Sequence, residues 1–375
     1  MKRAPYELTL ESRVADRQSI YRYHTADGVC SKHSFRTAEL LLADALWGTD
    51  LGALLSLEAN YGVVGTLLAD SAASVRMVES SARAVQLCER NIIANDVNAT
   101  TTLCADVASL NKVFDTIAYA PKPYTPLSIG TQRISAGLSA LNPDGTLYLT
   151  ASKQTGLGRY EQCLRDVAAT VEKIASRETC SVLKATRPRS FEPPTYVSPR
   201  EIHSSVAGTT LSLVTVPGLF SAQRVDDGTR LLLKTVTVKD GERVLDICCG
   251  YGAIGAYAGR TADCEVWLSD DDRVATMCAE CGLQASDVDG TVVTADCAEG
   301  VPEQSFERVL CNPPTHAGND ILSELFAGIR ETLAPNGELA VVHHRELSLQ
   351  RYLDQFNSVE ELQTGDEHIV LSAHR

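Results

Sequence analysis

Two successive prolines follow an asparagine in the motif Asn312-Pro313-Pro314, directly after the apolar residues 309–311. Proline has no backbone N–H group and cannot donate to a sheet ladder, so a strand must end at this motif. The residue before a proline is held extended, which fixes the direction of Asn312 and of its carbonyl group. The sequence therefore predicts a stiff loop at a strand end, which offers carbonyl oxygens and one side-chain amide to a ligand.

Three acidic residues occupy comparable places in the same half of the chain. Asp246, Asp270 and Asp296 each follow a short β-rich run, and helical stretches lie between these runs. Strands that alternate with helices predict an α/β fold with a parallel, doubly wound sheet, in which ligands bind beyond the carboxyl ends of the strands. Any one acid alone could cap a helix. Together with Asn312, four polar residues at successive strand ends indicate a ligand site.

The segment VLDICCGYGAIG, residues 244–255, ends a predicted strand and then turns on Gly250 and Gly252. Glycine lets a backbone approach a ligand closely, and the helix that follows directs its N-terminus towards that ligand. Cys248 occupies the place of the first glycine of the dinucleotide-binding fingerprint. Asp270 nevertheless lies 20 residues after Gly250, where an acid can accept from both ribose hydroxyls. A dinucleotide site therefore remains an alternative on these residues.

The chain also contains an internal repeat, because LNPDGTLYL at 141–149 matches LAPNGELAV at 333–341 with an offset of 192 residues. The register extends in both directions at offsets of 190 to 192. A period this long indicates two copies of one domain rather than a solenoid. Proline-rich residues without periodicity separate the copies. We therefore expect a first domain at 1–185, a linker at 186–200 and a second domain at 201–375.

The combined pattern resembles class I S-adenosylmethionine (SAM)-dependent methyltransferases. The residues that carry the resemblance are, in chain order, Asp246, Cys248, Gly250, Gly252, Asp270, Asp296 and Asn312-Pro313-Pro314. With TVPGLFSAQRVDDGTRLLL at 215–233, the pattern resembles the ribosomal RNA small-subunit methyltransferase C family, whose members are duplicated and methylate guanine N2. The sequence motifs of the family are matched over about residues 215–345, and the rest of the chain resembles the family only in its duplicated domain architecture. It implies two tandem Rossmann-like domains, the first degenerate and the second catalytic.

The resemblance also implies a role for each cofactor-binding residue. The loop from Asp246 through Cys248 to Gly252 would lie against the methionine part of SAM. Asp270 would hold the ribose, and Asp296 would contact the adenine amine. No metal and no nucleophilic cysteine are required, since the sulfonium carries an activated methyl group.

The catalytic role falls to Asn312, Pro313 and Pro314, which in the family hold a planar amino group for methylation. An aromatic amine is a poor nucleophile because its lone pair is delocalised into the ring. Acceptance of its N–H bonds by the Asn312 side-chain oxygen and the Pro313 carbonyl would free the lone pair and stabilise the growing positive charge. Most of the acceleration would come from holding nitrogen, methyl and sulfur in line.

One position departs from the family, which places an aromatic residue after the prolines to stack on the target base. Thr315 stands there and cannot stack, so His316 is the candidate that would take over this contact. His343 and His344, at the end of the next predicted strand, are weaker candidates. Thr315 and His316 are therefore the predicted substrate-binding residues, and the acceptor base is the part of the function that this departure affects.

The first copy has lost the polar residues of the second. Ser56 replaces Asp246, Asn60 replaces Gly250, and Pro121 replaces Asn312. Gly62, Gly65 and Glu79 persist at positions matching Gly252, Gly255 and Asp270. We therefore expect the first domain to be non-catalytic, with a structural or RNA-positioning role. Candidate phosphate contacts are Lys153, Arg159, Lys184, Arg187, Arg189 and Arg200.

Bulk properties narrow the class of protein. The net charge of −14 argues against indiscriminate binding of nucleic acid, although a local basic patch could still hold an RNA. The N-terminus has no signal peptide and no apolar run reaches the ~20 residues of a membrane helix, so we expect a cytoplasmic protein that binds no membrane. The pair Cys278 and Cys281 lacks a second ligand pair, and no metal site is expected.

The sequence thus predicts a SAM-dependent amine N-methyltransferase, with guanine N2 of small-subunit ribosomal RNA as its acceptor and RNA or the small ribosomal subunit as its partner. A tRNA guanine, adenine N6 or a protein glutamine would suit the same loop. A non-catalytic, SAM-binding RNA-assembly protein is the alternative from another class. The oligomeric state is open.

Overall fold

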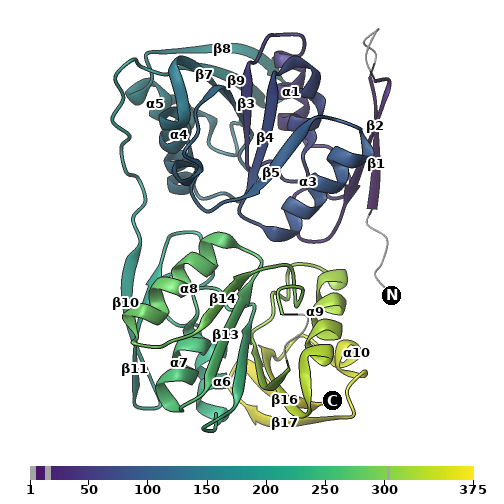
Figure 1. Cartoon of the computed structure of the whole chain (residues 1–375), viewed down its shortest axis with the longest axis vertical. Helices are drawn as coiled ribbons and strands as arrows, with labels where there is room; N and C mark the ends of the chain where they lie inside the picture. Colours follow the sequence, from purple (N-terminus) through teal and green to yellow (C-terminus); the bar gives the residue numbers. More distant parts are fainter. Residues whose placement is uncertain (1–5, 13–17, 302–304) are drawn as a thin grey trace. The chain divides into compact units, whose positions relative to one another are not determined.

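A computed structural model describes residues 6–12, 18–301 and 305–375 of the chain. The chain divides into two compact units, with the boundary between Ser198 and Pro199. Each unit is an α/β domain, and each is taken by itself below (Figure 1).

In its described part, the second domain contains a seven-stranded sheet in the order β14-β13-β12-β15-β16-β18-β17, preceded by the antiparallel hairpin β10–β11. The strands are β10 (Arg200–Val206), β11 (Thr209–Thr215), β12 (Arg243–Ile247), β13 (Glu265–Asp270), β14 (Thr291–Thr294), β15 (Phe306–Cys311), β16 (Leu333–His344), β17 (Ser358–Thr364) and β18 (His368–His374). The helices are α6 (Asp227–Thr235), α7 (Ala253–Thr261), α8 (Arg273–Ala285), α9 (Asn319–Thr332) and α10 (Gln350–Leu353).

The five strands from β14 to β16 run parallel, and β18 joins them antiparallel. Figure 1 shows α7 and α8 on one side of this sheet, with α9 and α10 on the other. Because helices cover both faces of the sheet, the central strands contain runs of adjacent buried apolar residues, such as 244–245 in β12 and 309–311 in β15. Their side chains form one core with α9, including Phe306 and Phe326, which are both fully buried. The predicted doubly wound sheet is confirmed.

The first domain repeats this architecture, with sheet order β5-β4-β3-β6-β7-β9-β8 and an antiparallel hairpin β1–β2. Its strands are β1 (Tyr6–Glu11), β2 (Ile20–Thr25), β3 (Ala53–Leu57), β4 (Ser74–Glu79), β5 (Ala99–Leu103), β6 (Phe114–Tyr119), β7 (Leu141–Ser152), β8 (Thr170–Arg177) and β9 (Cys180–Thr186). Its helices are α1 (Thr37–Leu46), α2 (Val63–Leu67), α3 (Ala82–Ala94), α4 (Leu127–Ala140) and α5 (Leu157–Val167), with short 3₁₀ turns η1 (Ala69–Ser71) and η2 (Val107–Leu110).

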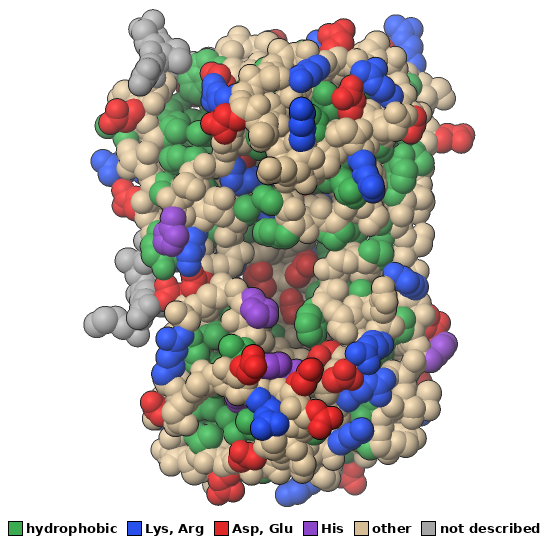
Figure 2. Space-filling view, turned by 180° about the vertical axis from the view of Figure 1, so that it is seen from behind, with side chains coloured by type: hydrophobic (Ala, Val, Ile, Leu, Met, Phe, Trp, Pro, Cys, Tyr) green, Lys and Arg blue, Asp and Glu red, His purple; other side chains and the backbone are tan. Residues whose placement is uncertain are grey.

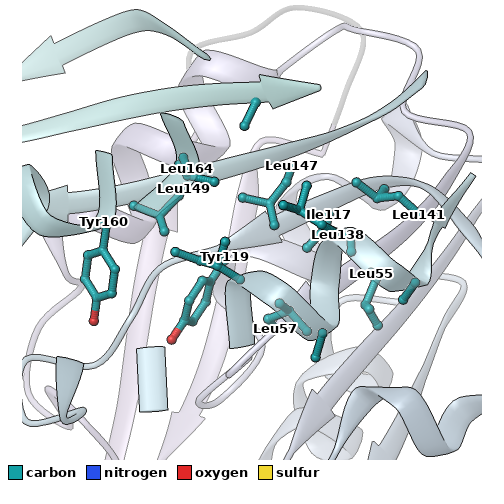
Figure 3. Packing of buried hydrophobic residues seen from close by; sticks show 14 of the residues in the cluster. Leu55, Leu57, Ile117, Tyr119, Leu138, Leu141, Leu147, Leu149, Tyr160 and Leu164 are labelled. Carbon is teal, nitrogen blue, oxygen red and sulfur yellow. The ribbon is translucent and has the colours of Figure 1, made fainter. Parts of the chain in front are cut away.

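One hydrophobic core cluster of the first domain lies between the central strands and helices α4 and α5. Figure 3 shows Leu57 and Tyr119 of adjacent strands packed near Leu149 and Tyr160, and all four side chains are buried. Because strand order and core match those of the second domain, the duplication predicted from the repeat is confirmed.

The residues between the two copies pack mainly on the first domain. After β9 ends at Thr186, the Arg187 guanidinium donates to the Leu138 carbonyl at 2.9 Å. Ser135 Oγ donates to the Pro194 carbonyl at 2.7 Å, and the Tyr196 backbone donates to Gln132 at 2.7 Å. The predicted linker, 186–200, therefore overlaps the end of β9 at Thr186 and the start of β10 at Arg200, and residues 187–199 between them lack regular structure but are held to the first domain.

Candidate active site

The strand order brings the predicted site residues to one edge of the second sheet. Asp270 is the last residue of β13, Asp246 the last but one of β12, Asp296 lies two residues after β14, and Asn312 directly follows β15. In the order β14-β13-β12-β15, these are four adjacent strands. The direction of winding reverses between β12 and β15, the place where open α/β sheets bind ligands.

The glycine loop between β12 and α7 has a left-handed backbone at three positions: φ is 61° at Cys248, 55° at Gly250 and 81° at Gly252. A Cβ at Gly252 would lie 2.9 Å from Leu268, so glycine there permits close packing on β13. A Cβ at Gly250 would meet nothing within 4 Å. The loop therefore leaves open space beside Gly250, where a ligand can approach the backbone.

Asp270 holds this loop in place through its carboxylate. Oδ2 accepts from the Gly250 backbone at 2.8 Å, and Oδ1 accepts from the Asp272 backbone at 3.0 Å. Burial raises the pKa of Asp270 to about 6 despite these two bonds. Each oxygen retains a second lone pair, so the carboxylate can still accept from a ligand hydroxyl.

Asp246 is completely buried. Its Oδ2 accepts from the Gly255 backbone at 2.9 Å and so ties β12 to the first turn of α7. Among the described residues, its Oδ1 has no hydrogen-bond partner. Burial raises the pKa of Asp246 to about 7. A buried carboxylate oxygen without a donor is a place that a ligand or an ordered water can satisfy.

Two residues hold the amide of Asn312: Asp226, the N-cap residue of α6, and Thr229, in the first turn of that helix. Nδ2 donates to Asp226 Oδ2 at 2.9 Å and to Thr229 Oγ1 at 3.0 Å. Asp226 also caps α6, because the same oxygen accepts from the Thr229 backbone at 2.8 Å. Since both amide hydrogens have acceptors, Oδ1 is the atom that Asn312 can offer to a substrate N–H group.

Asp226 and Thr229 were not among the predicted site residues. They lie within TVPGLFSAQRVDDGTRLLL at 215–233, the segment on which part of the family resemblance rests. That resemblance was the signal available in the sequence, but it assigned them no role.

The remaining predicted residues take different positions. The Pro313 carbonyl accepts from the Thr315 backbone at 2.9 Å, so its predicted contact with an amine would use its second lone pair. Pro314 and His316 are exposed, whereas Thr315 is half-buried. Asp296 is buried, and its carbonyl accepts from the Glu299 backbone at 3.0 Å.

The two histidines of β16 belong to the sheet. His343 is buried and its Nδ1 lies 2.9 Å from the His344 carbonyl. Burial lowers the pKa of His343, which favours the neutral imidazole. The His344 ring packs edge-on against His368 of the neighbouring strand, with ring centroids 5.6 Å apart.

In the first domain, the corresponding strand edge is filled by the chain's own side chains. The carboxylate of Glu79, at the position of Asp270, forms an ion pair with Lys122 Nζ at 2.9 Å and accepts a hydrogen bond from the Asn60 backbone at 2.6 Å. Glu58, at the position of Cys248, pairs with Arg133. Burial opposes ionisation of Glu58, but the Arg133 and Lys122 cations outweigh it and lower the pKa.

Two further contacts close the same edge. The Asn60 side chain bridges the backbone of Cys30, accepting from its N–H at 3.0 Å and donating to its carbonyl at 2.9 Å. Arg36, at the position of Asp226, donates to the carbonyls of Ala120 and Pro121. The first copy therefore keeps the loop geometry but uses its own side chains where the second leaves polar groups for a ligand.

Basic and acidic side chains are interspersed over the face of each domain that Figure 2 shows. Among the predicted phosphate contacts, Lys153, Arg159 and Arg200 are exposed. Arg189 pairs with Asp144 at 3.3 Å, and Arg187 binds backbone carbonyls of the first domain.

Two searches of the described residues complete the description. None of the helices in that part of the chain is long and apolar enough to cross a membrane. Within the same residues, no group of three or more His, Cys, Asp and Glu side chains is arranged to hold a metal ion.

The sequence matches the model of the methyltransferase small domain family twice, over residues 21–184 and 210–372. The ribosomal RNA small subunit methyltransferase C of Pseudomonas aeruginosa (strain UCBPP-PA14) is 29% identical over 255 residues, covering 65% of this chain and 75% of the relative. The Haemophilus influenzae protein of the same name is 34% identical over 162 residues, covering 41% of this chain and 49% of the relative.

A solved structure is similar along nearly the whole chain. The T. thermophilus 16S rRNA N2 G1207 methyltransferase (RsmC), in complex with AdoMet and guanosine, matches with a TM-score of 0.81 at 23% identity. The match covers 99% of this chain and 98% of that chain. At this identity the likeness establishes the fold, and the double family match agrees with the duplication seen in the two sheets.

Proposed function

This chain belongs to the methyltransferase small domain family, and from that premise we propose that its second domain transfers a methyl group from SAM to an exocyclic amine. The acceptor we propose is guanine N2 of small-subunit ribosomal RNA. Relatives named ribosomal RNA small subunit methyltransferase C support this acceptor.

The edge of the second sheet suits the cofactor. SAM, when bound, supplies a methyl group activated by its sulfonium. The open space at Gly250 admits a ligand against the glycine loop, and the unpartnered Oδ1 of Asp246 offers a buried acceptor at the same strand edge. Asp270 keeps lone pairs for the ribose hydroxyls, and we assign Asp296 to the adenine amine.

The orientation of the Asn312 amide is the observation that carries the proposal. Asp226 and Thr229 take both hydrogens of Nδ2, which turns Oδ1 into the acceptor for a substrate amine. Acceptance of an N–H by this oxygen favours a geometry in which the amine lone pair is free to attack. The same oxygen stabilises positive charge as it grows on the nitrogen, without reorganisation at the moment of reaction. The Pro313 carbonyl is the second acceptor that we assign to the amine.

The first domain is proposed to be non-catalytic. A ligand would have to displace the Lys122–Glu79 and Arg133–Glu58 pairs and the Asn60–Cys30 bridge from the strand edge. Breaking buried ion pairs is costly, so binding of SAM there is disfavoured. We assign to this domain two roles, stabilising the second domain and positioning the RNA.

Transfer to defined acceptors tests the proposal. The purified full-length protein is incubated with methyl-labelled SAM and unmodified 16S ribosomal RNA, free or in small subunits, and the nucleosides are separated by mass spectrometry. We expect label in N2-methylguanosine. Label in N6-methyladenosine, in tRNA or in protein glutamine would show that the acceptor is a different amine, while methyl transfer from SAM would stand. SAM binding without transfer to any of these would overturn the enzymatic function.

A further inference from the structure

The loop between β11 and α6, residues 216–226, carries one large apolar side chain that the fold leaves exposed. Phe220 is 70% exposed. The loop itself is tied to the glycine loop, because the Tyr251 hydroxyl lies 3.3 Å from the Ser221 carbonyl and 3.1 Å from the Arg224 carbonyl. At its end, Asp226 holds the Asn312 amide. Phe220 is thus displayed by a fixed loop that also contacts two parts of the active site.

The first domain contains the same loop 190 residues earlier, at residues 26–36. Ser31 and Ser221 both have a left-handed backbone, with φ of 59° and 48°. The Tyr61 hydroxyl lies 3.5 Å from the Ser31 carbonyl and 3.4 Å from the Ser34 carbonyl, which repeats the contacts of Tyr251. The two copies of the loop therefore have equivalent geometry, and contacts in one locate residues in the other.

Cys30 occupies in the first copy the position of Phe220 in the second. Its backbone is bridged by the side chain of Asn60, which occupies the position of Gly250. In the second copy a Cβ at Gly250 would meet nothing within 4 Å. The space that the Asn60 side chain fills in the first copy is thus open in the second, and the equivalence with Cys30 places the backbone of Phe220 at its rim.

Thr315 stands where the family has an aromatic residue, so the base-stacking contact of that residue has to come from another ring, and Phe220 is an exposed ring near the site. Aromatic rings hold an unstacked base by stacking on its face, and threonine after the two prolines cannot do so. A base taken out of the RNA stack is read in a pocket that supplies such a surface. We propose that Phe220 stacks on the target base at the rim of the open space beside Gly250, in place of a ring at Thr315. This assignment rests on the proposed function and names its base-binding residue.

Substitution of the exposed ring tests the assignment with little risk to the fold. In the full-length protein, Phe220→Ala is expected to raise the KM for ribosomal RNA about tenfold or more, the scale of one lost base–aromatic stack. The affinity for SAM should change less than about twofold. Phe220→Trp should restore the KM. Leu362→Ala, which removes a side chain 39% exposed on β17, is the matched control and should leave the KM unchanged.

A second readout reports stacking directly. An RNA fragment with 2-aminopurine at the target position is expected to lose fluorescence on binding to the wild type and to Phe220→Trp, and to keep it with Phe220→Ala. A loss of SAM affinity at unchanged KM for RNA would overturn the inference and place the ring over the cofactor. If Phe220→Ala has the wild-type KM for RNA and quenches 2-aminopurine as the wild type does, the inference is also overturned, while the proposed function stays intact. If the wild type transfers no methyl group, the proposed function fails instead.

Discussion

Asn312 and Asp226 are 86 residues apart in sequence, yet the Asn312 amide donates to the Asp226 carboxylate at 2.9 Å. The same carboxylate oxygen caps α6 by accepting from the Thr229 backbone. The start of one helix and the orientation of the proposed catalytic amide therefore depend on one group. In the first copy, Arg36 stands in place of Asp226 and binds the backbone of Pro121, which stands in place of Asn312. The contact between the two elements persists, but the polar group offered to a substrate is gone.

Thr229→Val should slow methyl transfer about tenfold, because one of the two acceptors that orient the Asn312 amide is lost while the size of the side chain is kept. The affinity for SAM should stay within about twofold. Thr229→Ser, which retains the hydroxyl, is the matched control and should transfer at nearly the wild-type rate. Single-turnover rates and calorimetry provide both measurements. Equal rates for Val and Ser at position 229 would show that this bond does not orient the amide.

Asp270→Asn should weaken SAM binding by about 1–3 kcal/mol, the scale of a hydrogen bond to a charged group. The isosteric change at the corresponding position of the first copy, Glu79→Gln, should leave SAM affinity unchanged, because Lys122 already occupies that carboxylate. Calorimetric titration of the full chain should find one SAM bound per molecule. A second site, or a loss of affinity in Glu79→Gln, would contradict the assignment of a single ligand-binding copy.

The pH dependence of stability should reveal the buried carboxyl of Asp246. Because burial raises the pKa of this group to about 7, the folded state binds its proton more tightly than the unfolded state. The contribution of Asp246 is therefore complete below about pH 4, the usual pKa of aspartate, and is lost as the pH rises through 7. Asp246→Asn, which can still accept from the Gly255 backbone, should become more stable relative to the wild type between pH 5 and 8. Denaturant unfolding without SAM measures this difference, and a difference that does not change with pH would contradict the burial argument.

Lys122→Met should destabilise the first domain by about 3 kcal/mol, because it leaves the buried Glu79 carboxylate without its cation. The double substitution with Glu79→Gln removes that charge and should recover much of the loss. Unfolding midpoints of the full-length single and double variants provide the comparison. If Lys122→Met is as stable as the wild type, the Lys122–Glu79 ion pair is not what holds the strand edge of the first domain closed to a ligand.

Much of the fold was predictable from sequence because the duplication repeats its apolar strands. β12 and β15 each contain a short apolar run, 244–245 and 309–311, directly before a polar residue, and α8 and α9 lie between strands as expected. The last strand pair is harder to recognise. The solvent-facing edge strand β17 is mostly exposed along its length, so it lacks the apolar alternation by which a half-buried strand is recognised.

That the strand-end residues of the candidate site meet at one edge followed from the same reasoning, because the carboxyl ends of parallel strands lie together. Contacts between distant elements did not follow. The bonds from Asn312 to Asp226 and Thr229 depend on how α6 packs beside the sheet, which no local pattern specifies. The Lys122–Glu79 pair likewise joins a loop to a strand 43 residues away, so only the structure showed that the first copy fills its own site.

The most direct measurement is methyl transfer by Asn312→Ala in a protein that still binds SAM. Removal of a preorganised oxygen that stabilises charge on the reacting nitrogen should lower the single-turnover rate about 10²–10³-fold. Calorimetry on the same sample should find SAM affinity within a few fold of the wild type. Transfer to ribosomal RNA at the wild-type rate by Asn312→Ala would contradict the account, because the amide that Asp226 and Thr229 orient would then have no part in the reaction.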